Sequence, residues 1–158
     1  MFREMRRNIQ ALPDDEIIAV LNLNSNGVLA CRGDDDYPYA VPLNYIYFNK
    51  KIYFHSAKLG HKLDSIVKDP KVSFAVIDED TILSETYTSA FRSVIAFGKA
   101  RITENPEHTE AFMALVEKYS GDQPEESKKH IVAHCERACI VAIDIEHLTG
   151  KQAKEFVK

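Results

Sequence analysis

The sequence contains no tryptophan and only six glycines in 158 residues. None of these glycines builds the G-x-G-x-x-G fingerprint of dinucleotide-binding folds, the G-x-x-x-x-G-K-[ST] phosphate loop or the G-x-S-x-G nucleophile elbow. Each motif needs glycine because its backbone turns sharply or approaches a ligand closely. Their absence excludes Rossmann-type dehydrogenases, P-loop NTPases and α/β-hydrolases.

Basic residues are too few for a nucleic-acid-binding protein. The 20 lysines and arginines are outnumbered by 24 aspartates and glutamates, which gives a net charge of −4. Binding to nucleic acid depends on an excess of clustered basic residues that neutralise phosphates. We therefore expect no nucleic-acid partner.

Long apolar segments are missing as well. Runs such as Val94 to Phe97 fall far short of the ~20 residues that span a bilayer. The segment from Met1 to Arg7 leads into polar Asn8 and Gln10 without the apolar core of a signal peptide. Three cysteines are an odd number for a disulfide framework. These features predict a soluble, cytoplasmic protein with no membrane partner.

The composition is that of one globular domain. Apolar residues make up 45% of the chain and charged residues 28%. A chain of this length buries roughly two thirds of its unfolded surface, so its own core suffices. No repeat, low-complexity tract or linker interrupts it, and we expect a single domain over residues 1–158.

Apolar and aromatic runs separated by short polar turns predict six strands, joined mainly by antiparallel connections. Four further segments have the apolar spacing of helices. This order predicts a mainly β fold, a small six-stranded antiparallel barrel with flanking helices. The expected strands are Val28–Arg32, Tyr39–Phe48, Ile52–Ser56, Val72–Ile77, Arg92–Ile102 and Ile140–Ile145, and the expected helices begin near Pro13, His61, Asn105 and Glu125.

The segment from Tyr53 to Lys62 has the features of a phosphate site. A predicted strand ends at the hydroxyl of Ser56, Gly60 lets the backbone approach a ligand, and Lys62 lies in the first turn of the next helix. Amide donors, a hydroxyl and one or two ammonium groups would converge there on one anion. The alternative is a plain strand-to-helix connection with solvated lysines.

The order of motifs around this segment resembles the flavin mononucleotide (FMN) binding split barrels related to pyridoxamine 5'-phosphate oxidase. Within that superfamily it is most similar to the nitroimidazole-resistance, or Nim-like, group. The resemblance covers nearly the whole chain. The segments that carry it are Tyr37–Tyr45, Ile52–Ala57, Gly60–Lys62, Arg92–Gly98 and Thr149–Lys151.

The resemblance implies a homodimer of six-stranded split barrels with FMN in clefts between the two protomers. One strand, Ala40 to Tyr45, would run along the flavin ring, and Ser56 and Lys62 would hold the phosphate. Ser93 and Lys151 would border the cofactor. The residues expected at FMN are Val41, Pro42, Leu43, Asn44, Tyr45, His55, Ser56, Ala57, Gly60, His61, Lys62, Ser93, Val94 and Lys151.

The implied function is that of an FMN-dependent oxidoreductase, which passes electrons from a nicotinamide donor to a small acceptor such as a nitroaromatic or a quinone. His55 and Tyr45 are candidates for proton transfer, and the connection from Asp78 to Thr88 is a candidate lid. His61 stands where the oxidases proper often carry arginine, which exchanges a permanent charge for a titrating one. Pyridoxamine phosphate is not expected as a substrate, because the tail from Lys151 to Lys158 lacks the arginines that grip its phosphate in the oxidases.

Two other classes of function stay open. In one, the protein binds FMN without turnover, as a carrier or a redox sensor. In the other, the barrel holds haem or a deazaflavin, as relatives in this superfamily do.

Two remaining clusters have simple explanations. The first cluster does not have the spacing that closes a tetrahedral zinc site, so no metal is expected; it consists of His130, His134, Cys135 and Cys139. Its cysteines are better explained as small buried side chains. A basic N-terminal patch is either a solvated face or a segment that closes over an anionic ligand. It consists of Arg3, Arg6 and Arg7.

Overall fold

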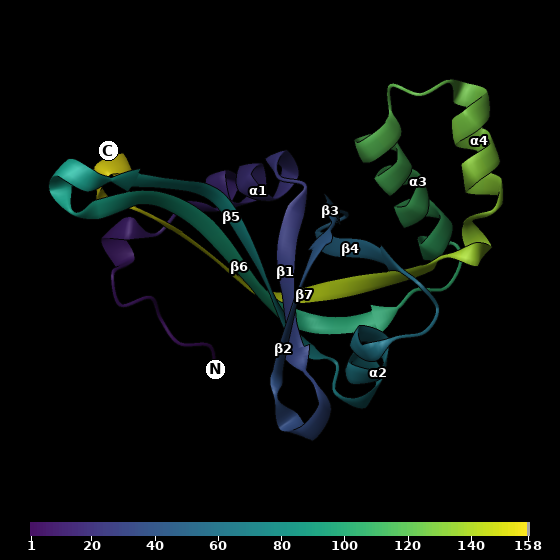
Figure 1. Ribbon diagram of the computed structural model, residues 1–158, viewed down its shortest axis with the longest axis horizontal. Coiled ribbons are helices and arrows are strands. Elements are labelled where there is room, and N and C mark those ends of the chain that lie inside the picture. Colours follow the sequence, from purple (N-terminus) through teal and green to yellow (C-terminus); the bar gives the residue numbers. More distant parts are fainter. Residues whose placement is uncertain (158) are drawn as a thin grey trace.

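The computed structural model describes residues 1–157 and is organised around one curled antiparallel sheet (Figure 1). Four helices flank the sheet: α1 (Asp14–Leu23), α2 (His61–Lys68), α3 (Glu107–Ser120) and α4 (Glu125–Ala133). The strands are β1 (Asn26–Arg32), β2 (Pro38–Asn44), β3 (Ile46–Phe48), β4 (Lys51–Ser56), β5 (Lys71–Leu83), β6 (Thr88–Ile102) and β7 (Cys139–Gln152).

The strand order of the sheet is β2-β1-β5-β6-β7-β4-β3, and every neighbouring pair is antiparallel. Strands β2 and β3 form the two edges of this order, yet only Tyr45 separates them in the chain. The sheet therefore curls until its edges meet in one segment, as a barrel requires. The predicted fold class is confirmed. Seven strands replace the expected six because the predicted strand Tyr39–Phe48 is broken at Tyr45.

The core lies inside the curl and is closed by two helices. Helix α1 follows Pro13 and carries acidic side chains through its first turn, where the partial positive charge of the helix end favours them. Helices α1 and α2 bury one apolar face each in the barrel interior, through Ile17, Val20, Leu21, Leu63 and Ile66.

Helix α3 covers the outside of the sheet. It buries Ala111 and Leu115 in a second, smaller cluster with residues of β4 and β7. Along β4, Ile52 and Phe54 point into the barrel and Tyr53 points to α3, as the alternation of a strand requires. The sheet is thus buried on both faces where α3 packs.

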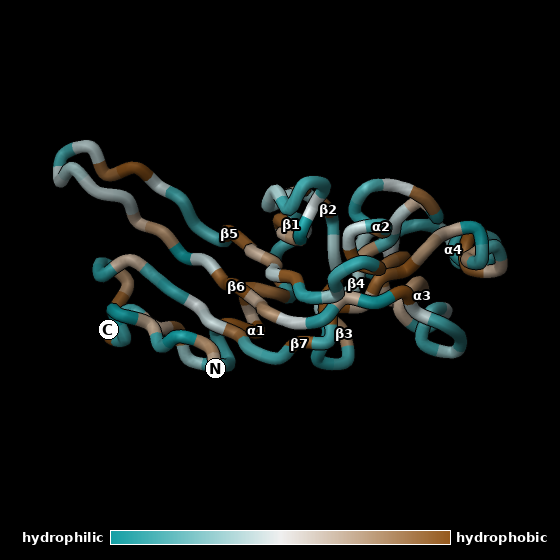
Figure 2. Tube along the Cα trace, turned by 90° about the horizontal axis from the view of Figure 1, so that it is seen from below, coloured by the Kyte–Doolittle hydropathy of each residue, from teal (hydrophilic) through white to brown (hydrophobic). Residues whose placement is uncertain are grey.

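The expected polar connection from Asp78 to Thr88 is wrong. Strands β5 and β6 stay paired from Lys71 opposite Lys99 out to Leu83 opposite Thr88, with one bulge, so the turn is confined to residues 84–87. The outer part of this hairpin, residues 77–95, projects from the barrel as an arm (Figures 1 and 2). Most of its outermost side chains are exposed, so the alternation of buried and exposed residues that marks a strand in a sequence is absent.

Strand β7 is also longer than expected and runs to Gln152. Thr149 and Lys151, which the resemblance assigned to a C-terminal segment, are ladder residues opposite Ile95 and Ser93 of β6. Most side chains after Ile145 are only partly buried, and many of them are polar. The sequence of this stretch therefore lacks the apolar alternation that predicts a strand.

The break at Tyr45 is held by a side chain from α3. The hydroxyl of Tyr119 lies 3.1 Å from the backbone nitrogen of Tyr45 and 2.5 Å from its carbonyl oxygen, and 2.8 Å from the carbonyl oxygen of Ser25. It accepts from the Tyr45 N–H and donates its one proton to a carbonyl. Next to it, the Lys118 ammonium donates to the Asn24 carbonyl at 2.6 Å, and burial lowers the pKa of this lysine.

Replacing Tyr119 by phenylalanine is expected to lower the free energy of unfolding by about 1–3 kcal/mol, because the polar groups at the strand break lose their partner. Urea unfolding followed by circular dichroism measures the change. Tyr87→Phe is the matched control, since Tyr87 is 99% exposed at the tip of the arm. Equal stability of the two variants contradicts the role given to Tyr119.

Candidate functional site

The residues of the predicted phosphate site lie where β4 passes into α2. Ser56, the last residue of β4, is buried, and its Oγ has no hydrogen-bond partner among residues 1–157. Gly60 precedes the helix with φ of 138°, a conformation that favours glycine. The chain therefore brings an unpaired hydroxyl to the start of a helix, where free backbone N–H groups attract anions.

Two lysines add positive charge to this position. Cys139 lies opposite Ser56 in the β4–β7 ladder, and both side chains belong to the inner face of the barrel. Burial raises the pKa of the Cys139 thiol, while the charges of Lys58 and Lys62 act in the opposite direction. Lys58 and Cys139 line the same hollow, so the Lys58 side chain lies near the ladder partner of Ser56. We refer to Ser56, Lys58, Gly60 and Lys62 as the cradle.

His61 links the cradle to the start of β2. Its Nε2 is bonded elsewhere and does not face a ligand in the cradle. Its ring stacks on Tyr39 with the ring centres 4.2 Å apart, and its Nε2 accepts a hydrogen bond from the Asp34 N–H at 3.3 Å. The imidazole therefore fixes the first turn of α2 against β2. Ala57, between Ser56 and Lys58, is exposed in the connection.

Strand β2 divides the residues predicted along the flavin ring between two faces. Val41 and Leu43 pack against the barrel core, whereas Ala40, Pro42 and Asn44 are exposed on the outer face. Of the residues predicted along the ring, Pro42 and Asn44 are therefore the ones whose side chains a ligand on the outer face of β2 can reach.

Tyr45 belongs to the core. Its side chain is fully buried, its hydroxyl donates to the Leu21 carbonyl at 2.8 Å, and burial raises its pKa well above the ordinary value. A phenol with these partners does not exchange protons with a ligand, so His55 is the candidate for proton transfer that is retained.

His55 faces away from the cradle. Because neighbouring residues of a strand point to opposite faces, the exposed His55 side chain lies on the α3 side of β4 and Ser56 on the barrel side. His55 lines a hollow of about 350 Å³ between the sheet and α3. Its other walls are mostly apolar and consist of Asn44, Phe112, Leu115, Val116, Tyr119 and Ser120.

Ser93 and Lys151 come together, but at the other end of the molecule. They are partners in the β6–β7 ladder, and the Lys151 ammonium lies 5.4 Å from the centre of the Phe91 ring. Val94 is fully buried in the core. Lys151 lies 12 residues along β7 from Cys139, which at ~3.3 Å per residue is roughly 40 Å of strand. One chain therefore carries two separate groups of predicted site residues.

A comparison with curated protein sequences finds no match. Residues 13–152 match the sequence family described as pyridoxamine 5'-phosphate oxidase, which is most of the chain. The chain belongs to this family.

Solved structures with the same fold support this assignment. A conserved hypothetical protein from Mycobacterium tuberculosis superimposes with a TM-score of 0.81 at 24% identity, over 96% of this chain and 92% of that one. A putative 5-nitroimidazole antibiotic resistance protein from Bacteroides thetaiotaomicron gives 0.74 at 19% identity, over 90% and 86%. An FAD-binding protein from Mesorhizobium loti gives 0.65 at 26% identity, over 91% and 97%.

The resemblance inferred from the motifs is confirmed as membership of the pyridoxamine 5'-phosphate oxidase family. A nitroimidazole resistance protein is among the structures that share its fold.

Sequence reasoning missed one residue of the cradle in this family member. Lys58 was not among the predicted site residues, although it stands two positions after Ser56. Its proximity to Lys62 and Cys139 follows from the tight connection before α2. The feature of the sequence that points to Lys58 is its position as a second lysine in the segment from Tyr53 to Lys62.

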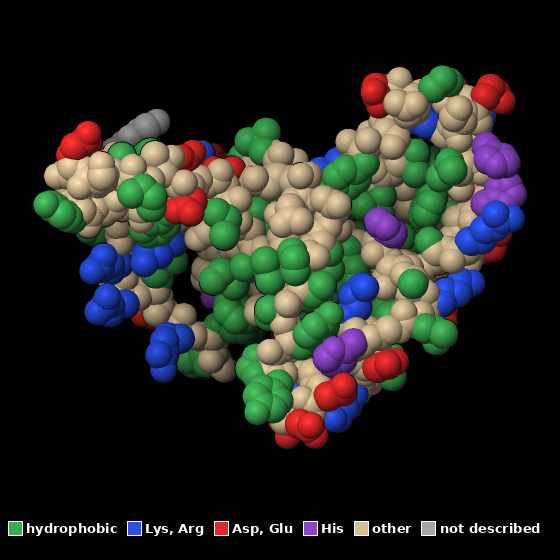
Figure 3. All heavy atoms as spheres, viewed as in Figure 1, with side chains coloured by type: hydrophobic (Ala, Val, Ile, Leu, Met, Phe, Trp, Pro, Cys, Tyr) green, Lys and Arg blue, Asp and Glu red, His purple; other side chains and the backbone are tan. Residues whose placement is uncertain are grey.

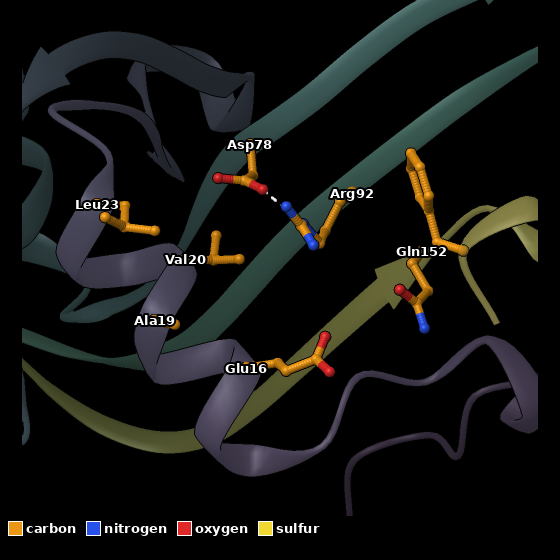
Figure 4. Close-up of a pocket in the computed structure, with 8 residues that line it drawn as sticks. Glu16, Ala19, Val20, Leu23, Asp78, Arg92 and Gln152 are labelled. Atoms are coloured by element: carbon orange, nitrogen blue, oxygen red, sulfur yellow. Dashed lines mark hydrogen bonds and ion pairs between the residues drawn. The ribbon is translucent and has the colours of Figure 1, made fainter. Parts of the chain in front are cut away.

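A second polar cluster was missed at the base of the arm (Figure 4). Asp78 accepts from the Arg92 Nε at 2.5 Å and from the Asn24 amide at 2.8 Å, beside a hollow of about 380 Å³ that Glu16 and Gln152 also line. The ion pair ties β5 to β6 next to the end of α1. It carried no signal in the sequence because Asp78 was assigned to a loop.

The remaining candidates lie apart from these groups. Within residues 1–157 no three metal-ligating side chains lie together; the His130 ring on α4 is 4.6 Å from the ring of His134, which follows the helix. Basic side chains gather along the N-terminal segment (Figure 3), which Phe2 fastens to the sheet by stacking on His147. No helix in the described part of the chain is both long and apolar enough to cross a bilayer.

Proposed function

We propose that this member of the family is a flavoprotein that binds FMN and acts as an oxidoreductase. The observation that carries the proposal is the Ser56 hydroxyl, which is buried and unpaired among residues 1–157 at the strand end that leads through Lys58 into the helix carrying Lys62. An unsatisfied buried hydroxyl costs about 1–3 kcal/mol, and a phosphate oxygen would satisfy it. The cradle thus fits the phosphate of a flavin, and the FAD-binding relative from Mesorhizobium loti supports a flavin as the ligand.

The chain offers a second surface for the ring of the same cofactor. The outer face of β2 presents Ala40, Pro42 and Asn44, and β2 has a ladder partner only on the side of β1. Its other side keeps unpaired backbone groups that suit a polar ring edge. His61, next to the cradle, stacks on Tyr39, which lies on the opposite, core-facing side of β2.

FMN supplies the redox chemistry when it is bound, taking electrons from a nicotinamide donor and releasing them to a small acceptor. The residues of the chain bind and orient the reactants. The hollow under α3 is the site we assign to the acceptor, because it begins at Asn44, the last exposed residue of β2. Its apolar walls suit a flat, uncharged molecule such as a nitroaromatic or a quinone. His55 places an imidazole in this hollow, a side chain that serves as a general acid or base in many enzymes.

We further propose that the active form is a homodimer with FMN at the interface. The cradle and the Ser93–Lys151 group lie at opposite ends of β7, so both border one cofactor only if a second copy supplies one of them. Large apolar side chains are exposed on the arm, which favours a protein contact: Ile77, Ile82, Tyr87 and Ile95.

Lys62→Glu is expected to weaken FMN binding about 10- to 100-fold, because an ammonium that faces the phosphate is replaced by a carboxylate. Quenching of flavin fluorescence on titration measures the dissociation constant. Lys50→Glu, in the exposed turn between β3 and β4, is the matched control and should leave it unchanged.

Ser56→Ala tests the same site independently of charge. It removes a buried hydroxyl that has no partner in the protein, so the FMN-free variant should be no less stable than the wild type while its affinity for FMN falls. Equal effects of Lys62→Glu and Lys50→Glu on FMN binding would refute the assignment of the cradle.

The homodimer predicts a mass of twice 17.9 kDa in sedimentation equilibrium. Pro42→Glu places a charge on the outer face of β2 and is expected to shift the protein towards the monomer and to weaken FMN binding together. Ile131→Glu, on the exposed side of α4, should change neither. A wild-type monomer that binds FMN normally contradicts the proposal.

Ser120→Trp is expected to fill the hollow under α3 and to lower kcat/KM for a nitroaromatic or quinone acceptor by about tenfold or more, with FMN affinity unchanged. Met113→Trp, on the same helix but outside this hollow, is the control. If the FMN-loaded wild type oxidises no reduced nicotinamide with either acceptor, the enzyme proposal fails and the protein is a carrier or a sensor.

A further inference from the structure

The hollow at the base of the arm has no part in the function proposed so far. Its volume of about 380 Å³ is within the range of small-molecule sites, which is about 300–1,000 Å³. Its polar walls include one ladder pair, Arg92 and Gln152. The next ladder pair is Ser93 and Lys151, which the alternation of the strands turns to the other face of the sheet. A ligand in this hollow is therefore separated by the sheet from the residues predicted at the flavin.

Gln152 is the first indication that the hollow takes a ligand. The residue is only 9% exposed and lines the hollow, yet its side-chain amide forms no hydrogen bond in the described part of the chain. Figure 4 shows this amide, the Arg92 guanidinium and the Glu16 carboxylate around the same space. Leaving a buried amide without partners is unfavourable, and a polar group of a ligand would satisfy it.

The charges of the hollow are one guanidinium and one carboxylate. Asp78 is occupied, because it accepts from the Arg92 Nε at 2.5 Å and from the Asn24 amide at 2.8 Å. These bonds hold the guanidinium in place, while its terminal N–H groups have no acceptor among the described residues. Glu16 forms no ion pair within residues 1–157. This arrangement suits a ligand that carries one charge of each sign.

The rest of the wall is apolar. Val20 and Leu23 of α1 line it together with Phe156, and the Arg92 guanidinium lies 6.0 Å from the centre of the Phe156 ring. Leu23 is 80% exposed and Phe156 is 37% exposed, so both keep apolar surface that a ligand would remove from water. The ligand therefore has an apolar group beside its two charges.

We propose that this hollow binds a free α-amino acid with a large apolar side chain, such as phenylalanine or leucine. The carboxylate of the ligand accepts from the terminal N–H groups of Arg92, whose forked geometry matches it. The ammonium group donates to the Glu16 carboxylate and to the Gln152 carbonyl oxygen, and the side chain packs on Leu23 and Phe156. The amino acid is a separately bound ligand and not a reactant of the flavin.

Calorimetric titration of the flavin-free full chain with L-phenylalanine tests the site. One molecule is expected to bind per chain, with a dissociation constant below about 1 mM. N-acetyl-L-phenylalanine lacks the ammonium group and phenethylamine lacks the carboxylate. Each is expected to bind about tenfold or more weakly than L-phenylalanine, because it leaves one charge of the hollow without a partner.

Glu16→Gln is expected to weaken the binding of L-phenylalanine about tenfold and to leave that of N-acetyl-L-phenylalanine unchanged, since this compound has no ammonium group. Asp15→Asn is the matched control, because Asp15 is exposed in the same first turn of α1 but does not line the hollow. Gln152→Met removes the amide at similar size and should also weaken the binding of L-phenylalanine.

Three results would each overturn the amino-acid site: no binding of L-phenylalanine or L-leucine at millimolar concentration, equal affinities for L-phenylalanine and its two analogues, or equal effects of Glu16→Gln and Asp15→Asn. The site is independent of the proposed function. It stands if the chain binds L-phenylalanine as predicted and no flavin, and it falls without consequence for FMN if only FMN binds.

Discussion

Strands β2 and β3 occupy opposite edges of the sheet, yet a single residue, Tyr45, joins them in the chain. The curl of the sheet is the only arrangement that satisfies both conditions. At the join the regular ladder fails, and the Tyr119 hydroxyl supplies the partner for the free backbone groups. The ring of Tyr45 fills the barrel interior at the same point. Closure, core packing and the position of α3 thus depend on one short segment.

The candidate site inherits its geometry from that closure. Because β2 ends at the join, its outer face meets the hollow under α3 at Asn44, while His61 ties the first turn of α2 to Tyr39 on the inner face of β2. Strand alternation then sorts the chemistry, since Ser56 faces the barrel and His55 faces α3. The chain thus places the cradle and the apolar hollow under α3 on different faces of β4 without any long loop.

The second group of predicted site residues, Ser93 and Lys151, lies on β6 and β7 where these strands extend beyond the apolar core. The arm leaves the barrel with exposed side chains, and the Asp78–Arg92 ion pair stiffens its base where the apolar core ends. Ser93 lies at the base of this arm, and Lys151 lies opposite it on β7, far from Ser56 along that strand. The exposed isoleucines of the arm favour a protein contact, as the proposed homodimer requires.

The order of the elements, the antiparallel barrel, the helix after Gly60 and the segment around Ser56 follow from local patterns and motifs in the sequence, because these depend on neighbouring residues. The extent of β5, β6 and β7 does not, since strands with exposed or half-polar faces lose the alternation that identifies them. Contacts between distant parts of the chain decide three further features. These are the partners of Tyr45, the separation of His55 from Ser56, and the place of Lys58 in a hollow formed with residues 102–108 and 136–139. The scarcity of glycine therefore excluded the common nucleotide folds by itself. The burial of the unpaired Ser56 hydroxyl four residues before Gly60 was decided by the packing of β4 against β7.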